Sequence, residues 1–162
     1  MAVAGGIKMK AYLVQHAEAK PESVDPDRGL TEKGQLDVEK ISAFIRPMQL
    51  RVTSMWHSDK TRAAQTARLL ESGLPSVKGL SQRDDLAPND PIAPVKHDIL
   101  AAEEDIAIVG HLPFLSKLAA SLLTGEESPG VIAFRQGGIV CLEREEDRAW
   151  RIAWMVFPEM FL

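Results

Sequence analysis

The stretch Tyr12-Leu13-Val14-Gln15-His16-Ala17 is a short apolar run that ends in a histidine and gives way to a polar loop broken by prolines. A bounded apolar run of this length is typical of a buried β-strand. The stretch Ile106-Ala107-Ile108-Val109-Gly110-His111 repeats the arrangement later in the chain. Two histidines at the ends of two buried strands indicate a candidate functional site, provided that both strands end at the same edge of one sheet.

Apolar runs alternate with helical patterns through most of the chain. Strands are expected at residues 10–15, 52–56, 77–80, 106–110, 131–134, 138–143 and 150–156, the last two as a hairpin. Helices are expected to begin after Thr31, after Ser58 or Asp59, near Val95 and after Pro113. This alternation predicts a three-layer α/β/α sandwich with a mostly parallel central sheet. Ligands of such sheets bind beyond the carboxyl ends of the strands, which is where His16 and His111 lie.

The bulk properties are those of an ordinary globular domain. The chain has 162 residues, enough for a sizeable core, and its net charge of −4 gives no basic field for nucleic acid. Its single cysteine, Cys141, cannot form an intramolecular disulfide, and no apolar run has the length of a membrane span. We expect one cytoplasmic domain over residues 1–162, with residues 1–9 as a flexible N-terminal extension and no nucleic-acid or membrane partner.

Two arginines stand near the proposed sheet edge. Arg62 falls in the first turn of a helix, where a cation opposes the helix dipole, so helix stability gives no reason for it. Arginine binds phosphate or carboxylate through paired hydrogen bonds, and helix N-terminal amides add anion affinity. Arg28, at the far end of the first long loop, can fold back over the same pocket. The sequence has no phosphate loop, dinucleotide fingerprint or Cys-x-x-Cys pair, and its four histidines are scattered, so no metal or cofactor is predicted.

Four motifs stand in order over about residues 10–125. They are Leu13-Val14-Gln15-His16-Ala17, Arg28-Gly29-Leu30-Thr31-Glu32-Lys33-Gly34, the segment 58–66, and Val109-Gly110-His111-Leu112-Pro113. Together they resemble the Arg-His-Gly, Arg-Pro-Leu-Thr-x-x-Gly, Ser-x-x-x-Arg-Ala-x-Gln-Thr and second-histidine motifs of the histidine phosphatase superfamily (phosphoglycerate-mutase-like). The short length, without a large helical insertion, is similar to the SixA-type phosphohistidine phosphatase branch. The resemblance implies a phosphoglycerate-mutase-like fold.

The resemblance also implies a mechanism, that of a metal-independent phosphatase without a cofactor. His16 would attack phosphorus and form a phosphohistidine, which divides one difficult displacement into two easier ones. The expected phosphoryl-binding residues are Gln15, His16, Arg28, Arg62 and His111. The implied substrate is a phosphorylated molecule, and a phosphohistidine-bearing protein is expected by resemblance alone. A small-molecule phosphomonoesterase and a weakly catalytic phosphate- or phosphoprotein-binding module are the alternatives.

The sequence departs from the family pattern in two places. Gln15 stands where the family has arginine and can donate a hydrogen bond, worth roughly 1.5–3 kcal/mol to a charged group, but carries no charge. This substitution predicts lower activity, a changed substrate preference, or compensation by Arg28. Ala17 replaces glycine, which indicates that no positive φ is required there.

The general acid is not fixed by the sequence. Asp85 is the first choice because it follows the third expected strand, and Asp90 and Glu18 are the alternatives. The physiological substrate and the oligomeric state also stay open.

Overall fold

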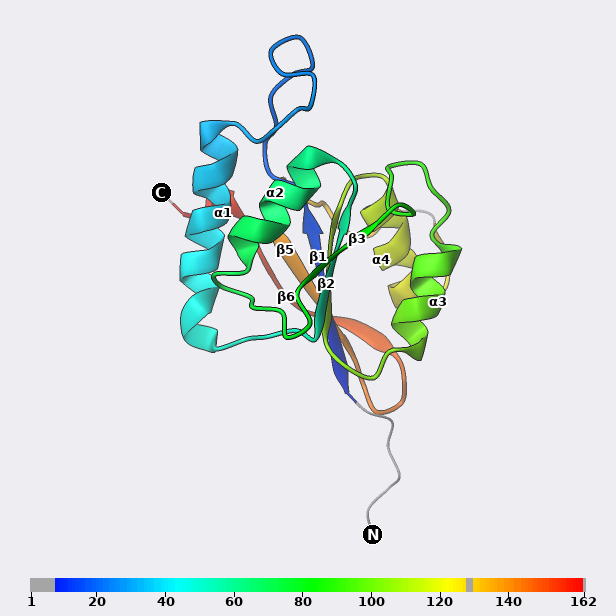
Figure 1. Ribbon diagram of the computed structural model, residues 1–162. Coiled ribbons are helices and arrows are strands. Elements are labelled where there is room, and N and C mark those ends of the chain that lie inside the picture. Colours follow the sequence, from blue (N-terminus) through cyan, green and yellow to red (C-terminus); the bar gives the residue numbers. More distant parts are fainter. Residues whose placement is uncertain (1–7, 128–129, 162) are drawn as a thin grey trace.

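A six-stranded sheet forms the centre of the molecule, with helices on both faces (Figure 1). The computed structural model describes residues 8–127 and 130–161. In chain order the elements are β1 (Met9–Gln15), α1 (Glu32–Ile45), η1 (Arg46–Met48), β2 (Ser54–Ser58), α2 (Thr61–Leu70), β3 (Leu80–Arg83), α3 (Ala93–Ala101), β4 (Ile106–Gly110), α4 (Phe114–Thr124), β5 (Ile139–Arg144), β6 (Trp150–Val156) and η2 (Pro158–Met160). Within the described residues, no helix is both long and apolar enough to cross a membrane. The predicted three-layer α/β/α architecture is confirmed.

The strand order of the sheet is β3-β2-β4-β1-β5-β6. Strand β1 runs parallel to β4, β4 to β2, and β2 to β3. The β5–β6 hairpin is antiparallel and joins the free side of β1, so the sheet is mostly parallel, as predicted. Gln15 of β1 is level with Gly110 of β4. The residues that follow them, His16 and His111, therefore leave the sheet at the same edge.

The apolar core consists of two layers, one on each face of the sheet. Leu13 and Ile108 belong to the layer that packs against α3 and α4. Tyr12 and Val109 belong to the layer that packs against α1 and α2. Central parallel strands are buried on both faces, so every position along them is apolar. This explains why both histidine-ending runs are apolar throughout rather than alternating.

Two strands begin later than the sequence predicted. Strand β2 starts at Ser54 rather than at residue 52, and β3 starts at Leu80 rather than at residue 77. Val52 forms only an isolated bridge with Ser76. Val77 is 70% exposed, so its apolar side chain marks a surface turn and not a buried strand.

The strand predicted at residues 131–134 is wrong. The segment is irregular, with Val131 exposed and Phe134 buried. It leads into a turn in which the Gly138 amide donates to the Arg135 carbonyl oxygen at 3.0 Å. The turn meets the sheet at the end of β1, where the Gly137 amide donates to the Gln15 carbonyl oxygen at 2.9 Å. Both edges of β1 are already paired, with β4 and β5, so no pairing position is left there.

Two boundary predictions also need correction. Met9, expected in the flexible extension, is buried and begins β1, while the expectation for residues 1–7 lies outside the described residues. Helix α2 is preceded by Lys60 at its N-cap, with no side-chain cap, and not by Ser58 or Asp59.

The long loop between β1 and α1 rests on the first turn of α1. The Thr31 hydroxyl accepts a hydrogen bond from the Gly34 amide at 3.0 Å, which confirms Thr31 as the N-cap. The Thr31 amide donates to the Glu18 carbonyl oxygen at 3.0 Å. Gly34 is buried beneath this contact, and a methyl group at position 34 would collide with the Glu18 backbone. The absence of a side chain at Gly34 thus allows the loop to pack on the helix.

We expect the substitution Gly34→Ala to lower the free energy of unfolding by about 1–3 kcal/mol, because the added methyl group overpacks a fixed backbone contact. Helix propensity alone would predict an increase in the free energy of unfolding, since alanine is favoured over glycine in a helix by about 1 kcal/mol. Urea unfolding measures the difference. The control is Glu39→Ala, at an exposed position of the same helix, which should be close to neutral. A Gly34→Ala protein as stable as the parent would contradict this packing argument.

Candidate active site

Polar side chains follow three neighbouring parallel strands at one edge of the sheet. His16 follows β1, His111 follows β4, and Ser58 is the last residue of β2. The ladder continues one step beyond β1, because the His16 amide donates to the Gly110 carbonyl oxygen at 2.9 Å. The centroids of the His16 and His111 rings lie 5.1 Å apart. The structure therefore brings the two histidines into one site.

A single hydrogen bond determines which ring nitrogen of His16 carries the proton. Its Nδ1 atom lies 2.8 Å from the Ala17 carbonyl oxygen. A carbonyl oxygen only accepts, so Nδ1 carries the proton and the neutral ring keeps its lone pair on Nε2. The Ala17 amide donates to the Thr66 hydroxyl at 3.0 Å, which holds this peptide in place, and Ala17 has no positive φ. His16 therefore presents Nε2 as a nucleophilic nitrogen.

His111 is almost completely buried, and Ser58 holds its ring. Its Nε2 atom lies 2.8 Å from the Ser58 hydroxyl oxygen. Its Nδ1 atom is buried without a hydrogen-bond partner among the described residues. The sequence indicated Ser58 only as a helix cap, and the structure shows that it positions His111. The available signal was its place as the first residue of the 58–66 motif.

Both histidines are held in the neutral form. Burial lowers the pKa of His16 to about 4; the hydrogen bond to Ala17 opposes this shift, and the positive charges of Arg62 and Arg28 add to it. Burial lowers the pKa of His111 to about 3, with further contributions from His16 and the same arginines. Neutral imidazole is the form that has a free lone pair, so His16 has an available nitrogen lone pair at neutral pH.

Arg62 enters the site from the first turn of α2. Its Nε atom is buried without a hydrogen-bond partner within the described part of the chain. Burial lowers the pKa of Arg62, and the neighbouring charge of Arg28 lowers it further. Thr66, one turn later, donates to the Arg62 carbonyl oxygen at 2.8 Å, so the residue that holds Ala17 is also tied to Arg62. A buried cation without a counter-charge is costly, and a bound anion would remove that cost.

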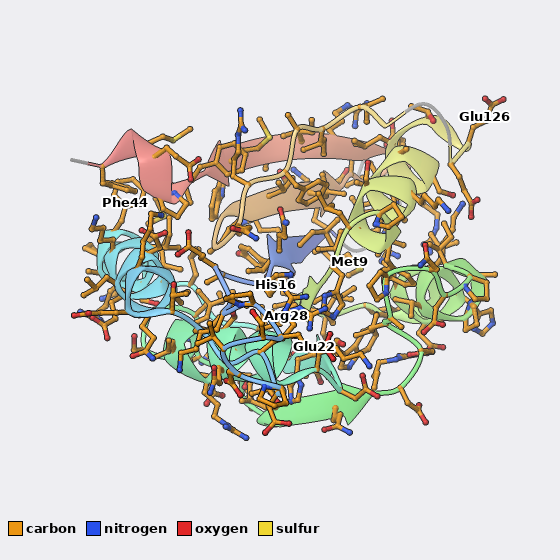
Figure 2. The ribbon with its side chains drawn as sticks, turned by 90° about the horizontal axis from the view of Figure 1, so that it is seen from above. Met9, His16, Glu22, Arg28, Phe44 and Glu126 are labelled. Carbon is orange, nitrogen blue, oxygen red and sulfur yellow. The ribbon has the colours of Figure 1, made fainter. Side chains whose placement is uncertain are left out.

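Arg28 lies in the loop that passes over this edge of the sheet (Figure 2). It adopts a positive φ of 51°, and its Nε donates to the Lys20 carbonyl oxygen at 3.1 Å. Asp25 does not pair with Arg28; its carboxylate accepts hydrogen bonds from two backbone amides of the same loop. The charge of Arg28 acts on His16, lowering its pKa. The loop therefore folds back and brings a second cation towards the histidines.

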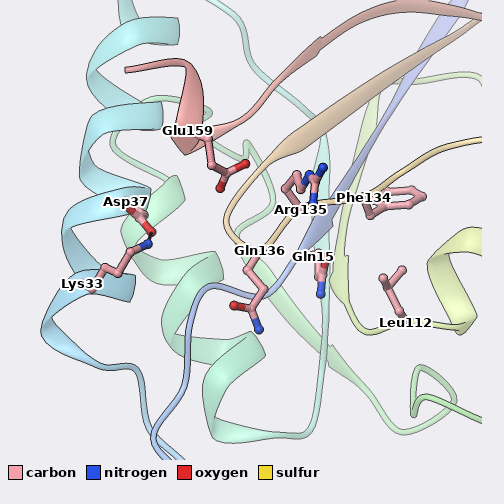
Figure 3. A pocket seen from close by; sticks show the side chains of 8 residues that line it. All are labelled: Gln15, Lys33, Asp37, Leu112, Phe134, Arg135, Gln136 and Glu159. Carbon is pink, nitrogen blue, oxygen red and sulfur yellow. Dashed lines mark hydrogen bonds and ion pairs between the residues drawn. The ribbon is translucent and has the colours of Figure 1, made fainter. Parts of the chain in front are cut away.

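Gln15 borders a cavity of about 550 Å³ (Figure 3). Its Oε1 atom is buried without a hydrogen-bond partner in residues 8–127 and 130–161. The sequence neighbours of both histidines line this cavity, Gln15 before His16 and Leu112 after His111, while the histidines themselves are not among its lining residues. Arg135, which the sequence analysis did not single out, also lines it.

Each carboxylate considered as a general acid is engaged elsewhere. Asp85 accepts two hydrogen bonds from Arg83, at 2.8 and 2.7 Å, and these hold the pKa of Asp85 below its usual range. Asp90 accepts from a backbone amide three residues earlier at 2.9 Å. Glu18 accepts from the Thr31 hydroxyl at 2.9 Å. Each of these three carboxyl groups therefore already has a hydrogen-bond partner outside the histidine pair.

The chemistry of the site is that of an anion pocket. Arg62 Nε is always a donor, and His111 Nδ1 donates when its Nε2 accepts from Ser58. Both are buried beside a nucleophilic imidazole. The part of the chain that the structure describes holds no group of three or more His, Cys, Asp or Glu side chains arranged for a metal ion. The site is suited to bind a group with several negatively charged oxygens and to attack its central atom.

Solved structures provide the comparison with known proteins. The protein histidine phosphatase SixA, complexed with tungstate, is similar over 94% of this chain and 99% of its own, with a TM-score of 0.80 and 20% sequence identity. Phosphoserine phosphatase from Entamoeba histolytica is similar over 91% and 96%, with a TM-score of 0.68 and 14% identity. Phosphoglycerate mutase from Plasmodium falciparum is similar over 92% and 91%, with a TM-score of 0.67 and 16% identity. No protein-family model matches the sequence, and no curated protein gives a significant match.

These similarities define the class of fold. The chain has a phosphoglycerate-mutase-like α/β fold, shared with histidine phosphatases and with SixA in particular. The predicted resemblance to this superfamily and to its SixA-type branch is confirmed at the level of the fold. Because the sequence identities are low, the activity has to be argued from the site itself.

The buried histidines predict a pH dependence of stability. Each has an ordinary pKa near 6.5 when unfolded and a lower pKa when folded, about 4 for His16 and about 3 for His111. Between these values the unfolded state binds more protons, so stability falls as the pH falls through this window. We expect a loss of about 2 kcal/mol per histidine between pH 7.5 and pH 5.

Urea unfolding at several pH values measures this loss. The double variant His16→Gln/His111→Gln should show a flatter dependence over the same range, because glutamine does not titrate. Parallel curves for the parent and the double variant would show that the two histidines are not held neutral by the fold.

Proposed function

We propose that this protein is a phosphatase that hydrolyses phosphohistidine on protein substrates through a covalent intermediate on His16. One observation carries the proposal. A neutral histidine with its lone pair on Nε2 lies beside the buried, unpartnered donors of Arg62 and His111, as found among the described residues. Phosphoryl transfer needs little more than a positioned nucleophile and stabilisation of negative charge on the phosphoryl oxygens.

The first step transfers the phosphoryl group to the protein. His16 Nε2 attacks phosphorus while the bond between phosphorus and the substrate imidazole breaks. A substrate ring protonated on its other nitrogen leaves as neutral imidazole and needs no further acid. The positive charge then resides on phosphorylated His16, where the Nδ1–H group donates to the Ala17 carbonyl oxygen. That hydrogen bond becomes charge-assisted in the intermediate and is strengthened.

The second step releases phosphate. Water attacks phosphorus, the bond to Nε2 breaks, both protons of the water stay on the phosphate, and neutral His16 returns. In both steps the charges of Arg62 and Arg28 offset the negative charge of the phosphoryl oxygens, and neutral His111 donates a hydrogen bond to them from Nδ1. The residues of this chain thus account for the chemistry without a metal ion, and we propose that the enzyme is metal-independent.

The state of the carboxylates favours phosphohistidine over a phosphomonoester. An alkoxide leaving group needs a proton from a general acid. Asp85, the first choice, is held ionised by Arg83, and the two alternatives are hydrogen-bonded away. A protonated imidazole leaving group avoids this requirement. The similarity to a SixA histidine phosphatase that binds tungstate, a tetrahedral oxyanion, supports the same substrate class.

Two alternatives stay in view. A small-molecule phosphomonoesterase would use the same nucleophile and would require Asp85 to leave Arg83 and donate a proton. A weakly catalytic phosphate- or phosphoprotein-binding module is favoured by Gln15, which supplies no charge beside His16. The experiment that follows separates all three.

Incubation with a radiolabelled, histidine-phosphorylated protein and quenching in alkali should leave acid-labile label on this protein. We expect turnover of that substrate, little or no turnover of para-nitrophenyl phosphate, and no effect of a chelator. His16→Ala should abolish the label, while His97→Ala, at an exposed histidine, should retain it.

Each other outcome identifies a different reading. Turnover of para-nitrophenyl phosphate alone would favour the phosphomonoesterase. Phosphate binding without label or turnover would favour the binding module. Label that persists in His16→Ala would show that another residue is the nucleophile.

Arg62 should speed the reaction by stabilising the negative charge on the phosphoryl oxygens in the transition state. We expect Arg62→Ala to lower kcat/KM by roughly 100- to 1,000-fold, the usual effect of removing one preorganised donor. Arg68→Ala is the matched control, because Arg68 is on the same helix and exposed. Steady-state kinetics measure both variants, and equal activities in the two would contradict the role of Arg62.

A further inference from the structure

The cavity beside Gln15 contains a cation that the proposed mechanism has not used. Its walls come from the strand ends, from α1, from the segment before β5 and from η2 (Figure 3). Figure 3 shows Arg135 and Gln15 between the Lys33–Asp37 pair on one side and Leu112 on the other. The cavity therefore places Arg135 next to the position where a positive charge is lacking.

A hydrogen bond fixes the backbone of this segment to Gln15. The Gly137 amide donates to the Gln15 carbonyl oxygen at 2.9 Å. Gly137 has a positive φ of 75°, and a side chain there would press on Pro158. Gly138 closes the turn by donating to the Arg135 carbonyl oxygen at 3.0 Å. Arg135 is thus held two residues from the contact with Gln15, while its long side chain extends from a fixed backbone.

The charges in the cavity leave Arg135 available. Asp37 is already paired with Lys33 at 2.6 Å. Glu159 is the other carboxylate of the cavity, and it forms no ion pair with Arg135. Within the described ranges, the Arg135 side chain is exposed and has no hydrogen bond or ion pair. The nearby Gln15 Oε1 atom is buried and unpartnered there, and an unsatisfied acceptor of this kind is suited to a guanidinium donor.

We infer that Arg135 supplies the cation that position 15 lacks, binding the phosphoryl group presented to His16 through its guanidinium. When phosphate is bound, Gln15 Oε1 would accept one hydrogen bond from the Arg135 guanidinium and direct it towards the strand edge. The inference rests on the proposed phosphoryl-transfer function. The positive charge that is missing at position 15 is thus replaced by Arg135, from the C-terminal part of the chain, in addition to Arg28.

The test titrates inorganic phosphate by calorimetry and measures kcat/KM on the histidine-phosphorylated protein. We expect Arg135→Ala to weaken phosphate binding and to lower kcat/KM, each by about 10- to 100-fold. Arg135→Lys should retain part of both. Gln15→Arg should restore most of the loss when added to Arg135→Ala, and should give a much smaller gain in the parent protein.

The matched control is Arg151→Ala. Arg151 is also exposed, but it borders a different cavity together with Lys8, at the opposite end of β1, so both quantities should be unchanged. Thermal unfolding checks that every variant is folded, and Arg135 is exposed, so its removal should not affect folding.

Two results would overturn the inference. One is an Arg135→Ala protein whose phosphate affinity and kcat/KM stay within about twofold of the parent. The other is a Gln15→Arg gain that is as large in the parent as in Arg135→Ala, because the two residues would then act independently. A different result would contradict the proposed function: a parent protein that binds phosphate but gives no label on His16. In that case phosphate affinity alone decides the role of Arg135.

Discussion

The site depends on one electrostatic constraint: positive and neutral nitrogen donors are buried together at the end of a parallel sheet, without a counter-charge from the described residues. Arg62 Nε and His111 Nδ1 have no hydrogen-bond partner in the described chain, and the charges of Arg62 and Arg28 act on both histidines. Such an arrangement weakens the fold when it is empty. It is also the preorganised environment that phosphoryl transfer requires, because donors already in place need no reorganisation when negative charge spreads over the phosphoryl oxygens.

The hydrogen bonds around this edge serve to hold that arrangement. Thr66 connects α2 to the peptide after His16, and Ser58 holds the ring of His111. The Thr31 N-cap and the close packing of Gly34 against the Glu18 backbone hold the loop that carries Arg28. Most of these contacts join segments far apart in the sequence. The packing of the helices therefore has to offset the cost of burying Arg62 Nε without a hydrogen-bond partner among the described residues.

The sequence was sufficient for the fold class and for the centre of the site, and the physical reason is that these signals are local. Strands buried on both faces are apolar at every position, and histidines at their ends fall at one edge once the strands are parallel. The strand expected at residues 131–134 was wrong because an apolar run does not show whether a sheet edge is available. The placement of Arg135 beside Gln15 depends on a contact between distant segments, which no local pattern indicates. The ion pair of Asp85 with Arg83 joins residues only two positions apart, and it depends on how the chain turns after β3.

The central claim is that the unpartnered donors beside His16 form a phosphoryl-binding site. A crystal structure of the protein with tungstate bound tests it most directly. We expect the oxyanion at His16 Nε2, within hydrogen-bonding distance of Arg62 and His111. An oxyanion bound elsewhere, with Arg62 and His111 still unpartnered, would contradict this account.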